Sequence, residues 1–241
     1  MMSRYFACLF GFSFVLVVGT ATGSAATWTL KNSSQITEYS SASSHSCPAM
    51  NVTAGDLLLS YNILYNGSTS GITLTNSDSQ GNAWSVIQTV AIPSVSILQI
   101  EYTRAKTSGS DTIKVSSSAS VHNVGNGCEE WSGGATSGLI LDGSAGVNSS
   151  ASGTTASASA TTNGSGDLVV GLCVFPSDAG SNFAMGAGAG YTQDVFNNYL
   201  QTTSVFQTAV PGGKQTANCT TKGPASSWSA IVAGFLSGSG T

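Results

Sequence analysis

Short apolar runs of strand length, separated by turn signals, follow one another along most of this chain. Residues 56–64 read as a buried strand, and Asn66-Gly67 follows it as a turn signal. Further runs of this kind occupy residues 71–74, 83–90, 96–102, 111–116 and 126–131. No stretch keeps a helical period for more than a turn or two. The sequence therefore predicts an all-β protein, an antiparallel β-sandwich of jelly-roll-like form.

The run 96–102 alternates in the way that a strand with two different faces requires. One face carries Leu98, Ile100 and Tyr102, and the other carries Ile97, Gln99 and Glu101. Because only the first set is uniformly apolar, we expect that face to point into the core.

The second half of the chain resembles the first. Residues 54–59, Ala-Gly-Asp-Leu-Leu-Leu, match residues 165–170, Ser-Gly-Asp-Leu-Val-Val, and residues 102–116 resemble residues 206–220. We interpret the mature chain as one sandwich domain, 27–241, of two related halves, 27–143 and 144–241, whose sheets bury their apolar faces against each other. Residues 144–166 are rich in Ser, Ala, Thr and Gly and fit either a linker or an edge strand. Their alternation at 154–162 favours the strand.

Charged residues are unusually few. The chain has 7 Lys+Arg, 11 Asp+Glu and a formal net charge of -4, while 41 % of its residues are hydrophobic. A basic footprint for nucleic acid or anionic lipid is therefore excluded as a main binding mode, and the hydrophobic content argues against a disordered chain.

Residues 1–26 have the form of a secretory signal peptide. Arg4 supplies the positive charge, residues 5–18 are almost wholly apolar, and Gly23-Ser24-Ala25-Ala26 offers a cleavage site. The alternative is a membrane anchor, but the apolar stretch is shorter than the roughly 20 residues that span a bilayer. We therefore expect a secreted or cell-surface protein with no membrane span.

Four cysteines remain once Cys8 is removed with this segment: Cys47, Cys128, Cys173 and Cys219. An even number in an oxidising compartment predicts two structural disulfides, and the spacings contain no zinc-binding pattern. Three pairings are possible. If each half is self-contained, Cys47–Cys128 and Cys173–Cys219 are the natural pairs.

Several of these short motifs together resemble a diffuse group of bacterial secreted β-sandwich modules. They are the Gly-Asp-Leu-Leu-Leu run, the segment Asn-Ser-Asp-Ser-Gln-Gly-Asn-Ala-Trp at 76–84, Glu-Trp-Ser-Gly at 130–133 and the second Gly-Asp-Leu-Val-Val run. The resemblance implies a β-sandwich that works outside the cell. It implies no activity and no catalytic residues, and the four cysteines here are not required in that group.

The common catalytic motifs are absent from the sequence, including the Gly-x-Ser-x-Gly nucleophile elbow. Glycoside hydrolysis needs two carboxylates across a cleft. Glu129 and Glu130 are adjacent, so on a strand they point to opposite faces, and either would need Glu101 or Asp142 as its partner. We expect no catalytic residues and keep a glycoside hydrolase as the third functional hypothesis.

A weak calcium-loop pattern occurs at Asn76, Asp78 and Gln80, with Gly81 at the sixth position. The twelfth position holds Ile87 in place of the closing Glu, so a hairpin turn capped by Asp78 is the favoured interpretation. No cofactor is expected, although calcium stays an alternative. Asp142 and the Gly143-Ser144 turn form a second weak oxygen cluster.

Aromatic and amide side chains give the most informative functional pattern. Aromatic rings stack on sugar rings while amides and carboxylates bond the hydroxyls. The residues with this mixture are Tyr191, Gln193, Asp194, Asn197 and Tyr199. We expect a non-catalytic module that binds a carbohydrate polymer or surface glycan. The alternative is a structural or adhesive surface protein that self-associates through strand edges.

Overall fold

The computed structural model describes residues 27–241 apart from 36, 66–69, 137, 139, 177–184, 198–199 and 239–241. The predicted signal peptide therefore lies outside the described residues. All regular structure in the described part of the chain is β-strand, and every strand pair is antiparallel. The predicted all-β antiparallel sandwich is confirmed. Within the described ranges no helix is long and apolar enough to cross a membrane.

The first half of the chain contains strands β1 to β9. Their bounds are β1 Thr29–Ser33, β2 Thr37–Ser46, β3 Met50–Val52, β4 Leu57–Tyr65, β5 Leu74–Asp78, β6 Ser85–Ile92, β7 Ser96–Arg104, β8 Gly109–Asp111 and β9 Ile113–Ser132. The predicted runs at 111–116 and 126–131 thus belong largely to one long strand. The first part of β9 pairs with β2 and β5, and its second part pairs with β1 and β4.

The second half contains strands β10 to β17. Their bounds are β10 Leu141–Gly153, β11 Thr155–Thr162, β12 Asp167–Val174, β13 Met185–Ala187, β14 Thr192–Asn197, β15 Thr202–Val210, β16 Gly213–Thr221 and β17 Ser226–Phe235. The low-complexity segment 144–166 is mostly strand, as its alternation favoured. Because β10 begins at Leu141, the structural boundary between the halves precedes the expected one at 143/144 by a few residues.

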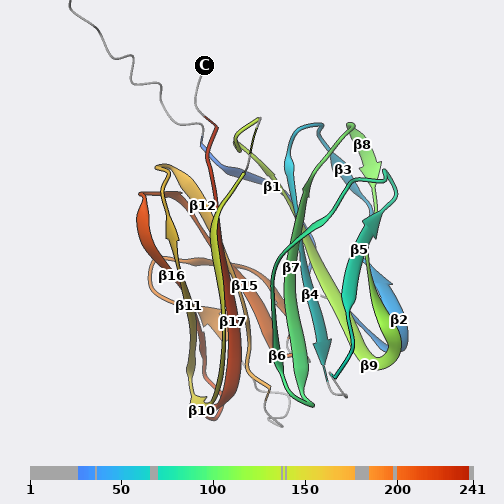
Figure 1. Ribbon diagram of the computed structural model, residues 1–241, viewed down its shortest axis with the longest axis vertical. Helices are drawn as coiled ribbons and strands as arrows, with labels where there is room; N and C mark the ends of the chain where they lie inside the picture. Colours follow the sequence, from blue (N-terminus) through green and yellow to red (C-terminus); the bar gives the residue numbers. More distant parts are fainter. Residues whose placement is uncertain are drawn as a thin grey trace, which may run out of the picture.

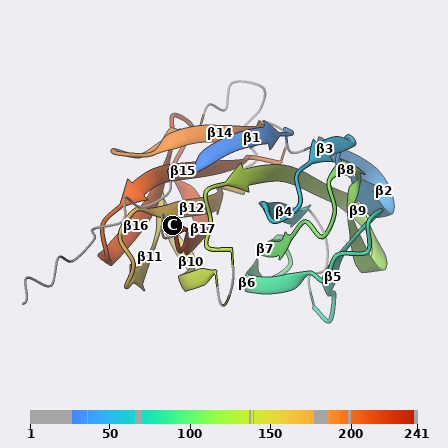
Figure 2. The same cartoon turned by 90° about the horizontal axis from the view of Figure 1, so that it is seen from above.

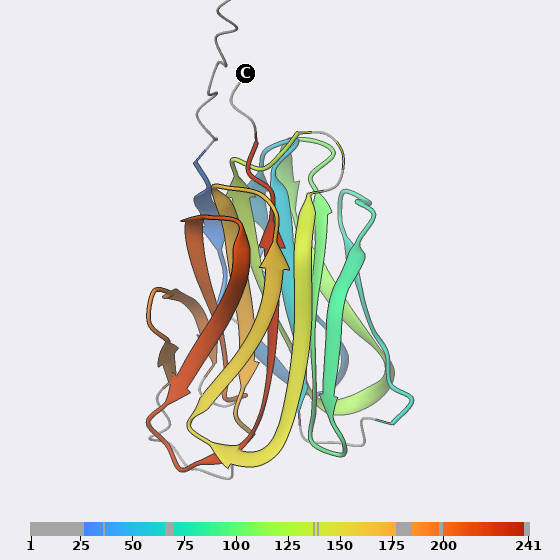
Figure 3. The same cartoon turned by 60° about the vertical axis from the view of Figure 1, so that its left-hand side comes forward.

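Each half is built from a main sheet and a smaller layer that covers its outer face. The first sheet has the order β1-β9-β4-β7-β6, and its cover is formed by β2, the first part of β9, and β5. The second sheet has the order β10-β17-β12-β15-β14, with β11-β16-β13 as its cover. Figure 1 shows the halves side by side, blue to green against yellow to red, and Figure 3 shows their strands running along the long axis.

The main sheets face each other across a shared hydrophobic core. Side chains from β4 and β7 meet those from β12 and β17, and the fully buried members include Leu57, Leu59, Ile63, Leu98, Ile100, Leu168, Val170, Leu172, Ile231 and Phe235. Burial of this much apolar surface, at roughly 25 cal/mol per Å2, is the main force that joins the halves.

The same register recurs in the two sheets and defines equivalent positions. Leu57 pairs with Trp131 in the first sheet, as Leu168 pairs with Phe235 in the second. Positions on β4 therefore correspond to β12 at an offset of 111, and positions on β7 and β9 correspond to β15, β16 and β17 at an offset of 104.

Two disulfides tie outer segments to the main sheets. Cys47, just before β3, is bonded to Cys128 on β9, and Cys173 on β12 is bonded to Cys219 on β16. The predicted pairing is confirmed, and buried disulfides of this kind are typical of an oxidising compartment.

Candidate functional site

A group of polar side chains is buried between the first sheet and its cover. Asn62 on β4 is its centre: the Asn62 Nδ2 group lies 3.0 Å from Asn76 Oδ1, 3.3 Å from Glu101 Oε1 and 3.4 Å from Gln99 Oε1. Asn62, Gln99 and Glu101 are at most 5 % exposed. We call Asn62, Asn76, Gln99 and Glu101 the amide–carboxyl cluster.

The second half has apolar or smaller residues at the equivalent positions. Asn62, Gln99 and Glu101 correspond to Cys173, Thr203 and Val205, and Asn126 beside the cluster corresponds to Ala230. Asn76 corresponds to Ala187. This region of the second half is a hydrophobic core that contains the Cys173–Cys219 disulfide. The fold therefore does not itself require buried amides and a carboxyl group here.

Two buried polar atoms at the cluster have no hydrogen-bond partner among the described residues. They are the Nδ2 atom of Asn76 and the Oδ1 atom of Asn126, whose residue is fully buried. Buried polar atoms nearly always have a partner, so an unpartnered donor and an unpartnered acceptor beside one cluster indicate a place that can form further hydrogen bonds.

The cluster reaches the surface along strand β6, an edge strand of the first sheet. Thr89 on β6 is exposed and its Oγ1 accepts a 3.0 Å hydrogen bond from Gln99 Nε2. Val86, which pairs with Glu101 across the sheet, is 54 % exposed. Trp84 lies two residues before Val86 and is half-buried. β6 thus presents an aliphatic group and a hydroxyl to solvent next to the cluster. The indole ring just before β6 is partly exposed beside them and packs on the core around the Cys47–Cys128 disulfide.

Strand β5 forms the other border of this region. It pairs with β9 on one side only, and the backbone amide of Asn76 donates a hydrogen bond to Glu101. Figure 2 shows β5 and β6 on the same side of the molecule, opposite β1 and β14. We call the surface formed by Asn76, Trp84, Val86 and Thr89 the β5–β6 seam.

Glu101 is the ionisable group of the cluster. Burial raises its pKa to about 7, although the hydrogen bond from the Asn76 amide acts in the opposite direction. Near neutral pH this side chain therefore exists in both forms, as a hydrogen-bond donor when protonated and as an acceptor when ionised.

The three residues of the calcium-loop pattern are engaged in separate interactions. Asp78 Oδ1 accepts hydrogen bonds from the backbone amides of Gln80 and Asn82, and Asp78 Oδ2 accepts a hydrogen bond of 2.7 Å from Trp84 Nε1. Asn76 joins the amide–carboxyl cluster, and Gln80 bonds backbone carbonyls of the β8 region. The structure therefore contains the turn capped by Asp78 that the sequence favoured. In the described ranges, no group of three His, Cys, Asp or Glu residues is placed to hold a metal ion.

The residues that the sequence assigned to a glycan site lie on and around β14, but they face different ways. The half-buried ring of Tyr191 packs on the hydrophobic core between the second sheet and its cover, and burial raises the pKa of Tyr191 to about 12. Asp194 points instead toward Glu129 between the two main sheets. Gln193 Nε2 donates to Thr203, and Asn197 Oδ1 accepts the Leu200 amide. Tyr199 lies outside the described residues.

Glu129 is buried between the two main sheets. Its Oε2 atom accepts hydrogen bonds from Tyr61 Oη at 2.7 Å and Trp131 Nε1 at 2.6 Å, and Ser204 Oγ lies 3.4 Å from Oε1. Burial, and then the negative charge of Asp194, raise the pKa of Glu129 well above its usual range. Trp131 lies in the shared core, whereas Trp84 and Trp228 are half-buried and pack against the outer cores of their halves.

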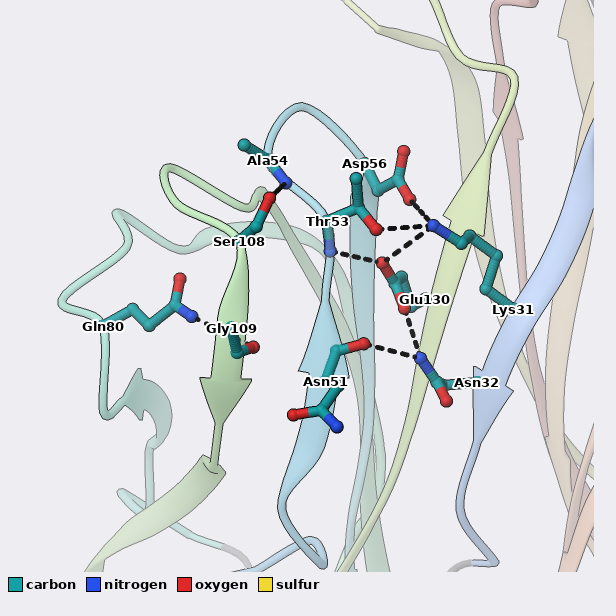
Figure 4. A network of polar contacts seen from close by, with 10 residues as sticks. All are labelled: Lys31, Asn32, Asn51, Thr53, Ala54, Asp56, Gln80, Ser108, Gly109 and Glu130. Carbon is teal, nitrogen blue, oxygen red and sulfur yellow. Dashed lines mark hydrogen bonds and ion pairs between the residues drawn. The ribbon is translucent and has the colours of Figure 1, made fainter.

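Glu130 points to the opposite face of β9, as adjacent positions on a strand require, and anchors a separate network (Figure 4). Its Oε1 atom accepts a hydrogen bond of 2.7 Å from the Thr53 amide and lies 3.8 Å from Lys31 Nζ. Its Oε2 atom accepts a hydrogen bond from Asn32 Nδ2. Lys31 Nζ also forms an ion pair of 3.1 Å with Asp56. This network joins β1 to β9 and to the turn that precedes β4.

Glu101, Asn76 and Trp84 each belong to a pattern visible in the sequence, but none of these patterns predicts that the three residues lie together. The repeat is the signal that could have brought them together. When the halves are aligned at offsets of 111 and 104, Asn62 corresponds to Cys173 and Glu101 to Val205, so the first half has polar residues where the second has apolar ones. Comparisons with protein-family models, with curated proteins and with solved structures found no match to this chain.

Proposed function

We propose that this protein is an exported, non-catalytic binding module that recognises a carbohydrate polymer or surface glycan through the β5–β6 seam. The observation that carries the proposal is the difference between the halves. One scaffold is used twice, and the first copy keeps amides and a carboxyl group buried at positions where the second copy has Cys173, Thr203 and Val205.

The chemistry of the seam suits a sugar. The half-buried indole of Trp84 and the exposed Val86 offer apolar contacts for the C–H face of a pyranose ring. The Asn76 amide, with its unpartnered Nδ2 donor, and the Glu101 carboxyl group bind hydroxyls as donors and acceptors. Few charges are involved, which fits a neutral polysaccharide better than an anionic polymer.

Export is part of the same proposal. The sequence features of residues 1–26 and the two buried disulfides both support a protein that works outside the reducing cytosol.

The test is a glycan array and an insoluble-polysaccharide pull-down with residues 27–241. We expect binding that Asn76→Ala weakens at least tenfold, while Thr161→Ala, which removes an exposed hydroxyl from β11 of the second half, leaves it unchanged. Binding that Tyr191→Ala abolishes and Asn76→Ala does not affect would move the site to β14. Absence of binding to every sugar, with concentration-dependent oligomers in its place, would favour the adhesive alternative.

A further inference from the structure

A lysine and an aspartate occupy equivalent positions in the two halves. In the first sheet the register shifts between Leu30 and Asn32, so that Lys31 is the extra residue of a bulge in β1. In the second sheet the shift falls between Leu141 and Gly143, so that Asp142 is the extra residue in β10. Leu30 pairs with Trp131 and Leu141 with Phe235, which are themselves equivalent.

The partner of that residue is an aspartate in both halves. Asp56 precedes Leu57 in the first half, and Asp167 precedes Leu168 in the second. In the first half the ammonium group of Lys31 lies 3.1 Å from Asp56 and balances its charge (Figure 4). In the second half two carboxyl groups, those of Asp142 and Asp167, face each other within hydrogen-bonding reach.

Asp142 is held in place by the loop between β11 and β12. It accepts hydrogen bonds from the Asn163 amide at 2.5 Å, the Gly164 amide at 2.8 Å and Asn163 Nδ2 at 3.0 Å. These donors lower the pKa of Asp142, opposing its burial, so its carboxylate is a fixed negative charge.

Asp167 is fully buried, and neither of its carboxylate oxygens receives a hydrogen bond from the described residues. The hydroxyl of Thr162 and the Ser237 amide lie close enough to influence it but outside hydrogen-bonding geometry, and Thr162 Oγ1 is itself buried without a partner. A Cβ at Gly164 would come within 2.6 Å of Asp167 Oδ1, so glycine keeps the loop close to this carboxylate.

We propose that Asp142, Asp167 and Thr162 bind a hard divalent cation, with Ca2+ as the best match, at the position where Lys31 supplies positive charge in the first half. Carboxylate and hydroxyl oxygens are the ligands that Ca2+ prefers, and water completes its shell of six to eight oxygens. A site with two carboxylates and several waters belongs to the weak class found in extracellular modules, with Kd on the order of 0.1 to 1 mM.

The experiment is a calcium titration of the purified protein at pH 7.5, followed by calorimetry and by thermal unfolding. We expect 10 mM Ca2+ to raise Tm by about 4 to 8 °C, with a smaller effect of Mg2+. Asp142→Lys reproduces the Lys31–Asp56 arrangement and should abolish the calcium response. Lys31→Ala is the matched control and should keep the response.

A second variant, Asp142→Asn, keeps an oxygen for the Gly164 amide, removes one charge and should raise the Kd for Ca2+ at least tenfold. The proposal would be overturned if the wild-type protein showed neither heat of binding nor a Tm shift up to 10 mM Ca2+. In that case a proton shared between Asp142 and Asp167 would explain how the two carboxyl groups lie together. A calcium response that persists in Asp142→Lys would also overturn the proposal.

Discussion

At the scale of single residues, burial sets the chemistry of the few carboxyl groups in this chain. Glu101, Glu129 and Asp167 all have pKa values above their usual range, and in each case burial is the first cause. Glu129 and Asp167 also face a second carboxyl group. The buried acidic residues are Glu101, Asp111, Glu129, Glu130 and Asp167, whereas the lysines of the described ranges are exposed.

Glu101 makes stability depend on pH in a defined direction. Its pKa is about 7 in the folded chain and about 4.5 when exposed, so the folded state holds the proton more tightly. The contribution of this proton to stability is complete below pH 4.5 and is lost as the pH rises through 7, which amounts to about 2 kcal/mol after allowance for partial solvation.

Glu101→Gln removes this titration. We expect the free energy of unfolding of the variant, from urea denaturation between pH 4.5 and 8.5, to fall less with rising pH than that of the wild type. Parallel pH profiles of the two proteins would show that Glu101 is already ionised at low pH in the folded state.

At the scale of elements, Glu130 should matter more than its ion pair does. It is fully buried and accepts both the Thr53 amide and the Asn32 side chain. Glu130→Ala leaves those donors unpaired and should lower the free energy of unfolding by about 2 to 4 kcal/mol. Lys31→Ala removes only an exposed ammonium group and should have a smaller effect in the same urea experiment. Equal losses would mean that the ion pair, and not the buried acceptor, holds β1 to β9.

Much of the element pattern was predictable because it follows from alternation and turns. The faces of β7 were assigned correctly, with Leu98, Ile100 and Tyr102 toward the shared core. The opposite face was not expected to be buried as well. Ile97, Gln99 and Glu101 are covered by a layer that the bent strand β9 carries over the sheet, and the bend has no local signal that separates it from two strands.

The ligand pattern on β14 contains a signal that the glycan prediction did not use. Tyr191 and Asp194 are three residues apart, and the register of β14 shifts between Gln193 and Phe196. An odd spacing on an extended strand already places the two side chains on opposite faces of the second sheet, so alternation along the sequence could have shown that they do not share one surface.

At the scale of the whole molecule, the halves are joined by an apolar core that contains one acidic pair. Glu129 comes from the first half and Asp194 from the second, and the negative charge of Asp194 raises the pKa of Glu129. Asp194→Asn removes that repulsion and offers an amide donor to Glu129. We expect Tm of the variant to exceed that of the wild type at pH 8, by a margin that shrinks toward pH 4, in differential scanning calorimetry. A lower Tm at pH 8 would indicate that Asp194 stabilises the interface in its charged form.

The disulfides act on the whole chain by restricting the unfolded state. They join residues 81 and 46 positions apart. On the chain-entropy estimate each contributes about 4 kcal/mol, and the longer loop contributes slightly more. Cys47→Ser/Cys128→Ser and Cys173→Ser/Cys219→Ser should therefore lower the urea midpoint to similar extents. A much larger loss for the second pair would show that packing at Cys173, the counterpart of Asn62, outweighs the entropic effect.

We infer that the first half keeps its buried amides and carboxyl group for a ligand and not for folding. The direct measurement replaces two of the four members of the amide–carboxyl cluster with their counterparts from the second half, Gln99→Thr and Glu101→Val, in one chain. It records both urea denaturation and binding to the glycan identified on the array. We expect a protein at least as stable as the wild type at pH 8 that binds the glycan at least tenfold more weakly. A double variant that unfolds, or one that folds and binds as well as the wild type, would contradict this inference.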